Sequence, residues 1–185
     1  MSDSRRKGGG AALTAAGRAG GRAEVGVQLF DVMVLLGGPS AEREVSLLSG
    51  TAIAEALQRV GHRVTRADIR PGDATALDRD ALEVVFIALH GDFGESGDVQ
   101  ELCERRRLAY TGSGPAASAL AIDKDAAKRA FRRAHLATPD WAVLHARDAD
   151  AAERAADLLD DAALPVVVKP VDGGSSVDVT IARTA

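Results

Sequence analysis

Two short runs of consecutive apolar residues place the strongest constraint on the fold of this chain. The first, residues 32–36, runs directly into Gly37-Gly38-Pro39, and the second, residues 84–89, runs into His90 and a glycine-rich loop. Strands that are apolar on both faces are typical of parallel sheets covered by helices on both sides. Apolar residues at helical spacing between positions 45 and 60 predict a helix that Gly61 ends.

The pattern of the first half of the chain therefore predicts an α/β domain with a parallel-dominated sheet. We expect further strands at residues 62–69 and 108–111 and a helix at residues 99–107. Ser40 is expected to cap the helix that follows the first strand, with Glu42 in its first turn.

The sequence pattern changes after residues 112–115, where glycine, serine and proline cluster. We expect a helix over residues 116–134, a strand at 141–144, a helix at 149–161 and a strand at 166–168. The predicted division is an extension at residues 1–29, one domain at 30–118 and a second at 119–185. The extension is rich in Gly, Ala and Arg and is expected to be disordered; a transit peptide or a basic RNA-binding arm is the alternative.

Composition excludes several classes of function. A net charge of −4 argues against a general nucleic-acid surface, and no apolar run has the length of a membrane span. The single cysteine, Cys103, cannot form an intramolecular disulfide, which favours a reducing compartment. No membrane or nucleic-acid partner is therefore expected.

Three positions stand where α/β folds place ligands. Glu42 follows the glycine pair of the first strand, His90 ends a buried strand, and Lys124 lies near the start of a helix. Each has an ordinary structural alternative: a carboxylate that complements the helix dipole, a hydrogen-bonded histidine, or a solvated lysine.

The most informative segment for chemistry is LPVVVKPVDGGSSVDV, residues 164–179. Lys169 at the end of a β-branched run supplies a mobile positive charge. The turn that follows, Gly173-Gly174-Ser175-Ser176, offers backbone N–H groups and hydroxyl donors. This combination predicts a phosphate-binding loop.

Four segments taken together closely resemble the D-alanine–D-alanine ligase family of ATP-grasp enzymes. In chain order they are LLGGPSAEREVSLLSG, FIALHGDFGESGDVQ, YTGSGPAASALAIDK and LPVVVKPVDGGSSVDV. The resemblance covers about residues 32–181. It implies a preATP-grasp (Rossmann-like) domain over residues 30–118, followed by an incomplete ATP-grasp central α+β domain over residues 119–185.

The resemblance implies a reaction in which ATP phosphorylates the carboxylate of one D-alanine and the amine of a second D-alanine attacks the acylphosphate. Glu42 matches the carboxylate that holds the first substrate's ammonium group, and Val45 lines the same pocket. His90 matches the residue near the first substrate's carboxylate, and Glu95 matches a supporting acid of the same loop.

On the nucleotide side, Lys124 and Lys169 match the two lysines that contact ATP phosphates. Ser175 matches a loop serine that bonds with the substrate-site glutamate, so that Glu42 and Ser175 are assigned to catalysis. Ser176 matches a phosphate-contacting position. The family implies peptidoglycan precursor synthesis in the cytoplasm and a homodimer.

The sequence departs from the family pattern in three ways. Ser96 and Asp178 stand where the family has Asp and Gly, and the ligands of the Mg²⁺ ions are expected downstream of this chain. We therefore expect no metal ligand here and no release of phosphate from ATP by the chain alone. The alternatives are a relative that joins D-alanine to D-lactate or D-serine, and a non-catalytic remnant that binds D-alanine or a nucleotide.

Overall fold

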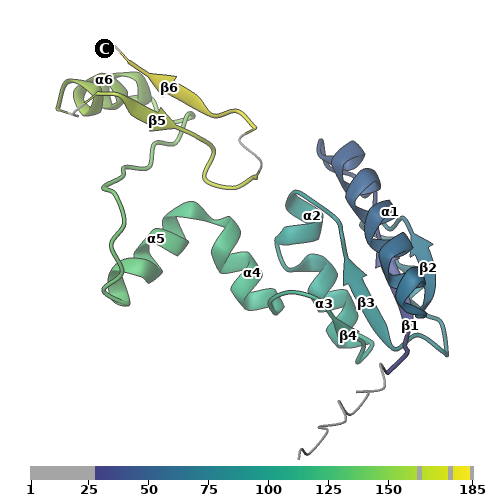
Figure 1. Cartoon of the computed structure of the whole chain (residues 1–185). Coiled ribbons are helices and arrows are strands. Elements are labelled where there is room, and N and C mark those ends of the chain that lie inside the picture. Colours follow the sequence, from purple (N-terminus) through teal and green to yellow (C-terminus); the bar gives the residue numbers. More distant parts are fainter. Residues whose placement is uncertain (1–27, 162–163, 175–176, 184–185) are drawn as a thin grey trace, which may run out of the picture.

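The computed structural model describes residues 28–161, 164–174 and 177–183. The expected disordered extension lies almost wholly outside these ranges. The elements run in the order β1 (Asp31–Leu35), α1 (Arg43–Val60), β2 (Arg63–Ala67), η1 (Thr75–Leu77), β3 (Val84–Ile87), α2 (Asp92–Glu95), α3 (Asp98–Arg105) and β4 (Ala109–Tyr110) (Figure 1). They continue with α4 (Pro115–Ile122), α5 (Lys124–Arg133), α6 (Ala151–Asp161), β5 (Val166–Val168) and β6 (Thr180–Ala182).

The first four strands form a sheet in the order β2-β1-β3-β4, and each neighbouring pair is parallel. The register places Met33 of β1 beside Thr65 of β2 on one side and Val85 of β3 on the other. The prediction of a parallel-dominated α/β domain is therefore confirmed.

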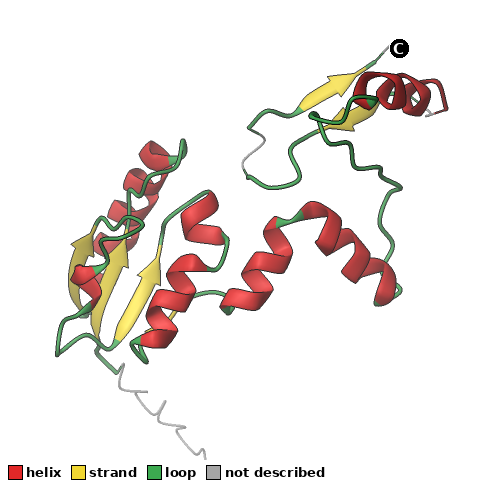
Figure 2. Ribbon diagram, turned by 180° about the vertical axis from the view of Figure 1, so that it is seen from behind, coloured by secondary structure: helices red, strands yellow, loops and turns green. Residues whose placement is uncertain are grey.

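Both faces of β1 are buried, as its continuous apolar run predicts. Met33 and Leu35 point to one face, where they pack with residues of η1, β3 and α3. Val32, Val34 and Leu36 point to the other face, where they pack with Ala54 of α1. Figures 1 and 2 show α1 on one side of the sheet and α3 on the other, so the domain has three layers.

The strand order fixes where a ligand site can form. From β1 the chain crosses to β2 on one side, and β3 lies on the opposite side of β1. The carboxyl ends of β1 and β3 are therefore neighbours at a point where the connections diverge, which is where open α/β sheets bind ligands.

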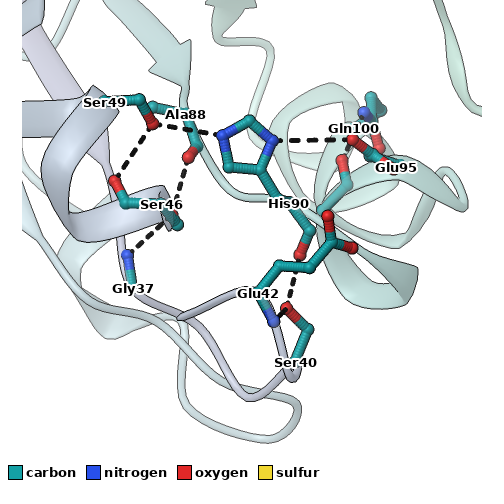
Figure 3. A network of polar contacts seen from close by, with 10 residues as sticks. Gly37, Ser40, Glu42, Ser46, Ser49, Ala88, His90, Glu95 and Gln100 are labelled. Atoms are coloured by element: carbon teal, nitrogen blue, oxygen red, sulfur yellow. Dashed lines mark hydrogen bonds and ion pairs between the residues drawn. The ribbon is translucent and has the colours of Figure 1, made fainter. Parts of the chain in front are cut away.

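One buried hydroxyl group joins these two strand ends. Ser46 of α1 is fully buried, donates a hydrogen bond to the carbonyl oxygen of Ala88 (2.6 Å) and accepts one from the N–H of Gly37 (2.9 Å) (Figure 3). Neither backbone group lies within a strand ladder, so Ser46 satisfies both of them.

The second part of the chain is smaller and more open. α4 packs against α2 and α3 of the first part, and α5 follows it after a bend. β5 and β6 form an antiparallel hairpin, with Val167 opposite Ile181. An extended stretch links α5 to α6, which lies next to the hairpin in both views (Figures 1 and 2).

The start of α1 differs from the prediction. The helix begins at Arg43 with Glu42 as its N-cap residue, so Glu42 precedes the first turn. The Ser40 hydroxyl accepts the Glu42 N–H (3.1 Å) and donates to the carbonyl oxygen of His90 (2.8 Å). Ser40 therefore stabilises the turn before the helix, because its hydroxyl accepts from Glu42 within that turn, and it also bonds the turn to the His90 loop.

Two predictions in the second part are wrong. The helix expected over residues 116–134 is broken at Asp123, whose carboxylate accepts the Ala126 N–H (2.9 Å) and caps α5. The strand expected at residues 141–144 is not a strand, since within the described ranges its backbone pairs with no neighbouring strand.

Replacement of Gly50 by alanine tests the close packing of α1 on β1. A Cβ atom on Gly50 would lie 2.5 Å from the Leu36 Cβ. Alanine alone favours a helix over glycine by about 1 kcal/mol, but overpacking costs about 1–3 kcal/mol. We expect Gly50→Ala to lower the free energy of unfolding, measured in urea, with the exposed Gln58→Ala of the same helix as control. A stabilised Gly50→Ala variant would contradict this packing.

Replacement of Ser46 by alanine tests the link between the strand ends. The variant leaves the Gly37 N–H and the Ala88 carbonyl without their partner, at a cost of about 1–3 kcal/mol. Urea unfolding measures the loss. Ser96→Ala is the matched control, because the Ser96 hydroxyl is bonded only to Asp98 at the surface (3.1 Å). Equal stabilities of the two variants would show that the link contributes nothing.

Candidate functional site

The loops that follow β1 and β3 contact each other directly. A Cβ atom on Gly91 would lie 2.8 Å from the Ser40 Cβ and 3.0 Å from Oε2 of Glu42. Gly91 also has a φ of +74°, a conformation that favours glycine. Only a residue without a side chain therefore allows Glu42 to lie this close to the His90 loop.

The ring of His90 has a polar neighbour at each nitrogen. Its Nε2 lies 3.1 Å from the hydroxyl of Ser49 on α1, and its Nδ1 lies 3.7 Å from Oε1 of Glu95 at the end of α2 (Figure 3). The His90 carbonyl oxygen accepts the Ser40 hydroxyl. Both the backbone and the ring of His90 are thus held at the carboxyl end of β3.

The glycine pair after β1 is held by an ion pair. Arg43 and Asp68 are joined at 2.6 Å; the arginine also donates to the Gly38 carbonyl (3.0 Å), and the aspartate accepts the Gly38 N–H (2.9 Å). The Arg43 guanidinium lowers the pKa of the Asp68 carboxyl below its ordinary value. The charged pair therefore fixes the backbone that leads to Glu42.

The loop between β5 and β6 reaches back to these carboxylates. A Cβ atom on Gly174 would lie 3.3 Å from Oε2 of Glu95 and 3.7 Å from Oε2 of Glu42. The two views show this loop approaching the end of the first part where α2 lies (Figures 1 and 2). The structure thus brings the loop close to two carboxylates that come much earlier in the sequence.

Hydrogen bonds from Lys124 hold this loop against the start of α5. Its side-chain Nζ donates to the carbonyl oxygens of Gly173 (2.8 Å) and Val171 (3.2 Å). Its backbone N–H also donates to Val171 (2.9 Å). The break at Asp123 makes this possible, because it places Lys124 at the first position of a new helix.

A pocket of about 230 Å³ lies where the loop meets α5. Its lining consists of Lys124, Lys169, Pro170, Gly173, Gly174, Val177 and Val179. Two cations and a glycine-rich backbone are features of a site for a phosphate-bearing ligand.

The structure brings five of the predicted site residues to one region. Glu42, His90 and Glu95 surround the carboxyl ends of β1 and β3, and Lys124 and Lys169 line the adjoining pocket. Val45 lies on the first turns of α1 and is 57% exposed. Ser175 and Ser176 lie outside the described residues.

Sequence reasoning did not select Ser46, Ser49, Arg43 or Asp68. The sequence did offer a signal for the two serines. They lie three residues apart in the helix predicted after the first strand, so both are on one face of that helix. Arg43 and Asp68 are far apart in the sequence, and only the parallel pairing of β1 with β2 brings them together.

A larger hollow of about 520 Å³ lies away from these residues, beside Trp141. Arg132 stacks on the Trp141 ring at 4.4 Å, and Arg129 is paired with Asp125 at 2.8 Å. The Trp141 N–H also donates to Asp125 (2.7 Å). These contacts pair Asp125 with Arg129 and hold Trp141 against α5.

The site combines carboxylates suited to an ammonium group with lysines suited to phosphate. Within the described ranges, no three His, Cys, Asp or Glu side chains gather as a metal site would require. The residues described here therefore do not fit the Mg²⁺ ions that the resemblance implies, and no step is assigned to them. No described helix is both long enough and apolar enough to cross a membrane.

Comparison with known proteins gives one consistent result, although no family model matches the chain. The D-alanine–D-alanine ligase of Desulforudis audaxviator is 47% identical over 148 residues, which are 80% of this chain and 47% of that protein. The ligase of Gloeobacter violaceus is 48% identical over 156 residues, 83% of this chain and 50% of that protein. The chain thus spans about half the length of the curated relatives it matches.

Solved structures agree with these sequences. A D-alanine–D-alanine ligase from Bacillus anthracis has a TM-score of 0.67 at 31% identity, over 84% of this chain and 50% of that one. The same enzyme complexed with ATP has a TM-score of 0.70 at 28% identity, over 86% and 50%. The VanG D-Ala:D-Ser ligase from Enterococcus faecalis shares the fold, with a TM-score of 0.66 at 24% identity, over 83% and 55%. By sequence and by fold, the chain belongs to the D-alanine–D-alanine ligase family of ATP-grasp proteins.

Proposed function

We propose that this chain carries the first-substrate site and part of the phosphate site of an ATP-dependent D-alanine–D-alanine ligase. In this reaction a D-alanine carboxylate oxygen attacks the γ-phosphorus of ATP, which forms D-alanyl phosphate and releases ADP. The amine of a second D-alanine then attacks the acyl carbon, and the amide bond forms as inorganic phosphate leaves.

The observation that supports this proposal most is the approach of Gly174 to Glu42 and Glu95. A substrate ammonium held by a carboxylate here lies next to the loop that would hold the phosphates. Transfer of a phosphoryl group needs this closeness, because positioning and charge stabilisation supply most of its catalysis.

On the substrate side, we assign the ammonium group of the first D-alanine to Glu42 and its carboxylate to His90. Glu95 is assigned the support of the His90 loop, and Val45 the lining of the pocket. The contact of Glu95 with the His90 ring, and the position of Glu42 beside Gly91, support these assignments.

On the nucleotide side, we assign the ATP phosphates to Lys124, Lys169, Ser175 and Ser176. Lys124 donates to two loop carbonyls in this structure. An incoming phosphate group would compete with those carbonyls for its ammonium group, whereas Lys169 is exposed beside the same pocket.

The family membership also supports a role in peptidoglycan precursor synthesis in the cytoplasm, with Mg²⁺ required for the complete reaction. We further propose a homodimer. Exposed apolar side chains on α1, such as Leu48 at 74% exposure, support an interface on that helix.

Removal of the Glu42 charge tests the substrate assignment. We expect Glu42→Gln to weaken D-alanine binding at least tenfold (about 1.4 kcal/mol), since a charge-assisted hydrogen bond to the ammonium group is lost. Isothermal titration calorimetry measures the affinity. Glu44→Gln is the matched control, because Glu44 lies two residues away in the first turn of α1 and carries the same charge. Equal affinities of the two variants would refute the role of Glu42.

Removal of the Lys169 charge tests the nucleotide assignment. We expect Lys169→Met to weaken ATP binding by about tenfold, because a cation near the phosphates is lost. Competition with a fluorescent ATP analogue measures the change. Lys128→Met is the control: Lys128 donates to Thr138 (2.8 Å) and does not line the pocket. A loss of affinity in both variants would point to general charge attraction and against a specific contact.

A further inference from the structure

The hydroxyl group of Ser49 lies between two hydrogen-bonding groups. It is 3.1 Å from Nε2 of His90 and 3.3 Å from the carbonyl oxygen of Ser46, one turn earlier in α1 (Figure 3). A serine hydroxyl has one proton and can also accept, so it donates to one of these neighbours at a time.

The protonation of the His90 ring decides which neighbour receives that proton. The Glu95 carboxylate, 3.7 Å from Nδ1, favours a proton on that nitrogen. In the neutral ring Nε2 is then an acceptor, and Ser49 donates to it. In the charged ring Nε2–H donates to Ser49, whose own proton turns to the Ser46 carbonyl.

We propose that Ser49 is a positioning residue that selects the Nδ1–H tautomer of neutral His90 and keeps Nε2 bonded in either charge state. The hydroxyl turns about its own C–O bond, so the ring stays in place while the proton on Nε2 comes and goes. Ser46 and Ser40 hold the backbone on both sides of this ring through Ala88 and His90.

This inference rests on the proposed function in one respect: it matters for the reaction only if His90 faces the substrate carboxylate. A ring fixed in this way presents the same geometry to the substrate whether or not it carries a charge. An unfixed ring would have to be ordered on binding, which lowers affinity.

The tautomer itself is the direct test. Long-range ¹H–¹⁵N correlation spectra of the ¹⁵N-labelled chain distinguish the two neutral tautomers, and His90→Gln identifies the signals of this ring. Spectra are recorded as the solution is made alkaline until the shifts no longer change. We expect the Nδ1–H form to dominate, and Ser49→Ala to lower the Nδ1–H to Nε2–H ratio by about tenfold, the effect of one hydrogen bond.

Ser49→Thr is the matched variant, because it keeps the hydroxyl group. We expect it to retain the tautomer ratio of the parent chain and its affinity for D-alanine, whereas Ser49→Ala weakens that affinity by about two- to tenfold. An unchanged ratio in Ser49→Ala would overturn the inference even where Glu42→Gln behaves as expected. A changed ratio without any D-alanine binding would leave the tautomer selection intact and refute the proposed function.

Discussion

The parallel pairing of β1 with β3 is the constraint on which the site depends. It brings the loops after these strands together at the carboxyl end of the sheet. There the buried Ser46 hydroxyl bonds to Gly37 after β1 and to Ala88 after β3. Without that bond two backbone groups would lack partners at the point where both loops begin. The positions of Glu42 and His90 therefore follow from the sheet and not from the loops alone.

A second constraint comes from the break between α4 and α5. Asp123 caps α5 and turns the chain, so that Lys124 faces the loop after β5. The loop is then held by three hydrogen bonds to one residue. Gly174 completes the arrangement, since a Cβ atom there would lie only 3.3 Å from the carboxylate of Glu95. Glu42 and Glu95 thus lie beside the loop that Lys124 holds.

Much of the first part could be predicted from the sequence, because runs such as residues 32–36 leave no polar face and require helices on both sides. The features that could not be predicted depend on which backbone groups a polar side chain bonds to in the folded chain. Ser40 was expected to cap a helix, but the helix begins two residues later than that, and the Ser40 hydroxyl instead accepts the Glu42 N–H in the preceding turn while it donates to the His90 carbonyl. Asp123 interrupts an Ala-rich helix because its carboxylate competes for the Ala126 N–H. Contacts such as Ser49 with His90 depend on the sheet register, which the sequence does not state.

Asp178 stands where the resemblance implies a glycine, and this difference has a conformational and an electrostatic effect. Asp178 has a φ of +56°, so the position is left-handed, the conformation that a glycine would adopt most readily. Aspartate is among the residues that tolerate this conformation. Its neighbours Val177 and Val179 line the pocket of Lys124 and Lys169, so Asp178 adds a negative charge one residue away from that lining in the sequence. An aspartate here is thus compatible with a left-handed backbone and changes the charge that a phosphate group would meet in the proposed site.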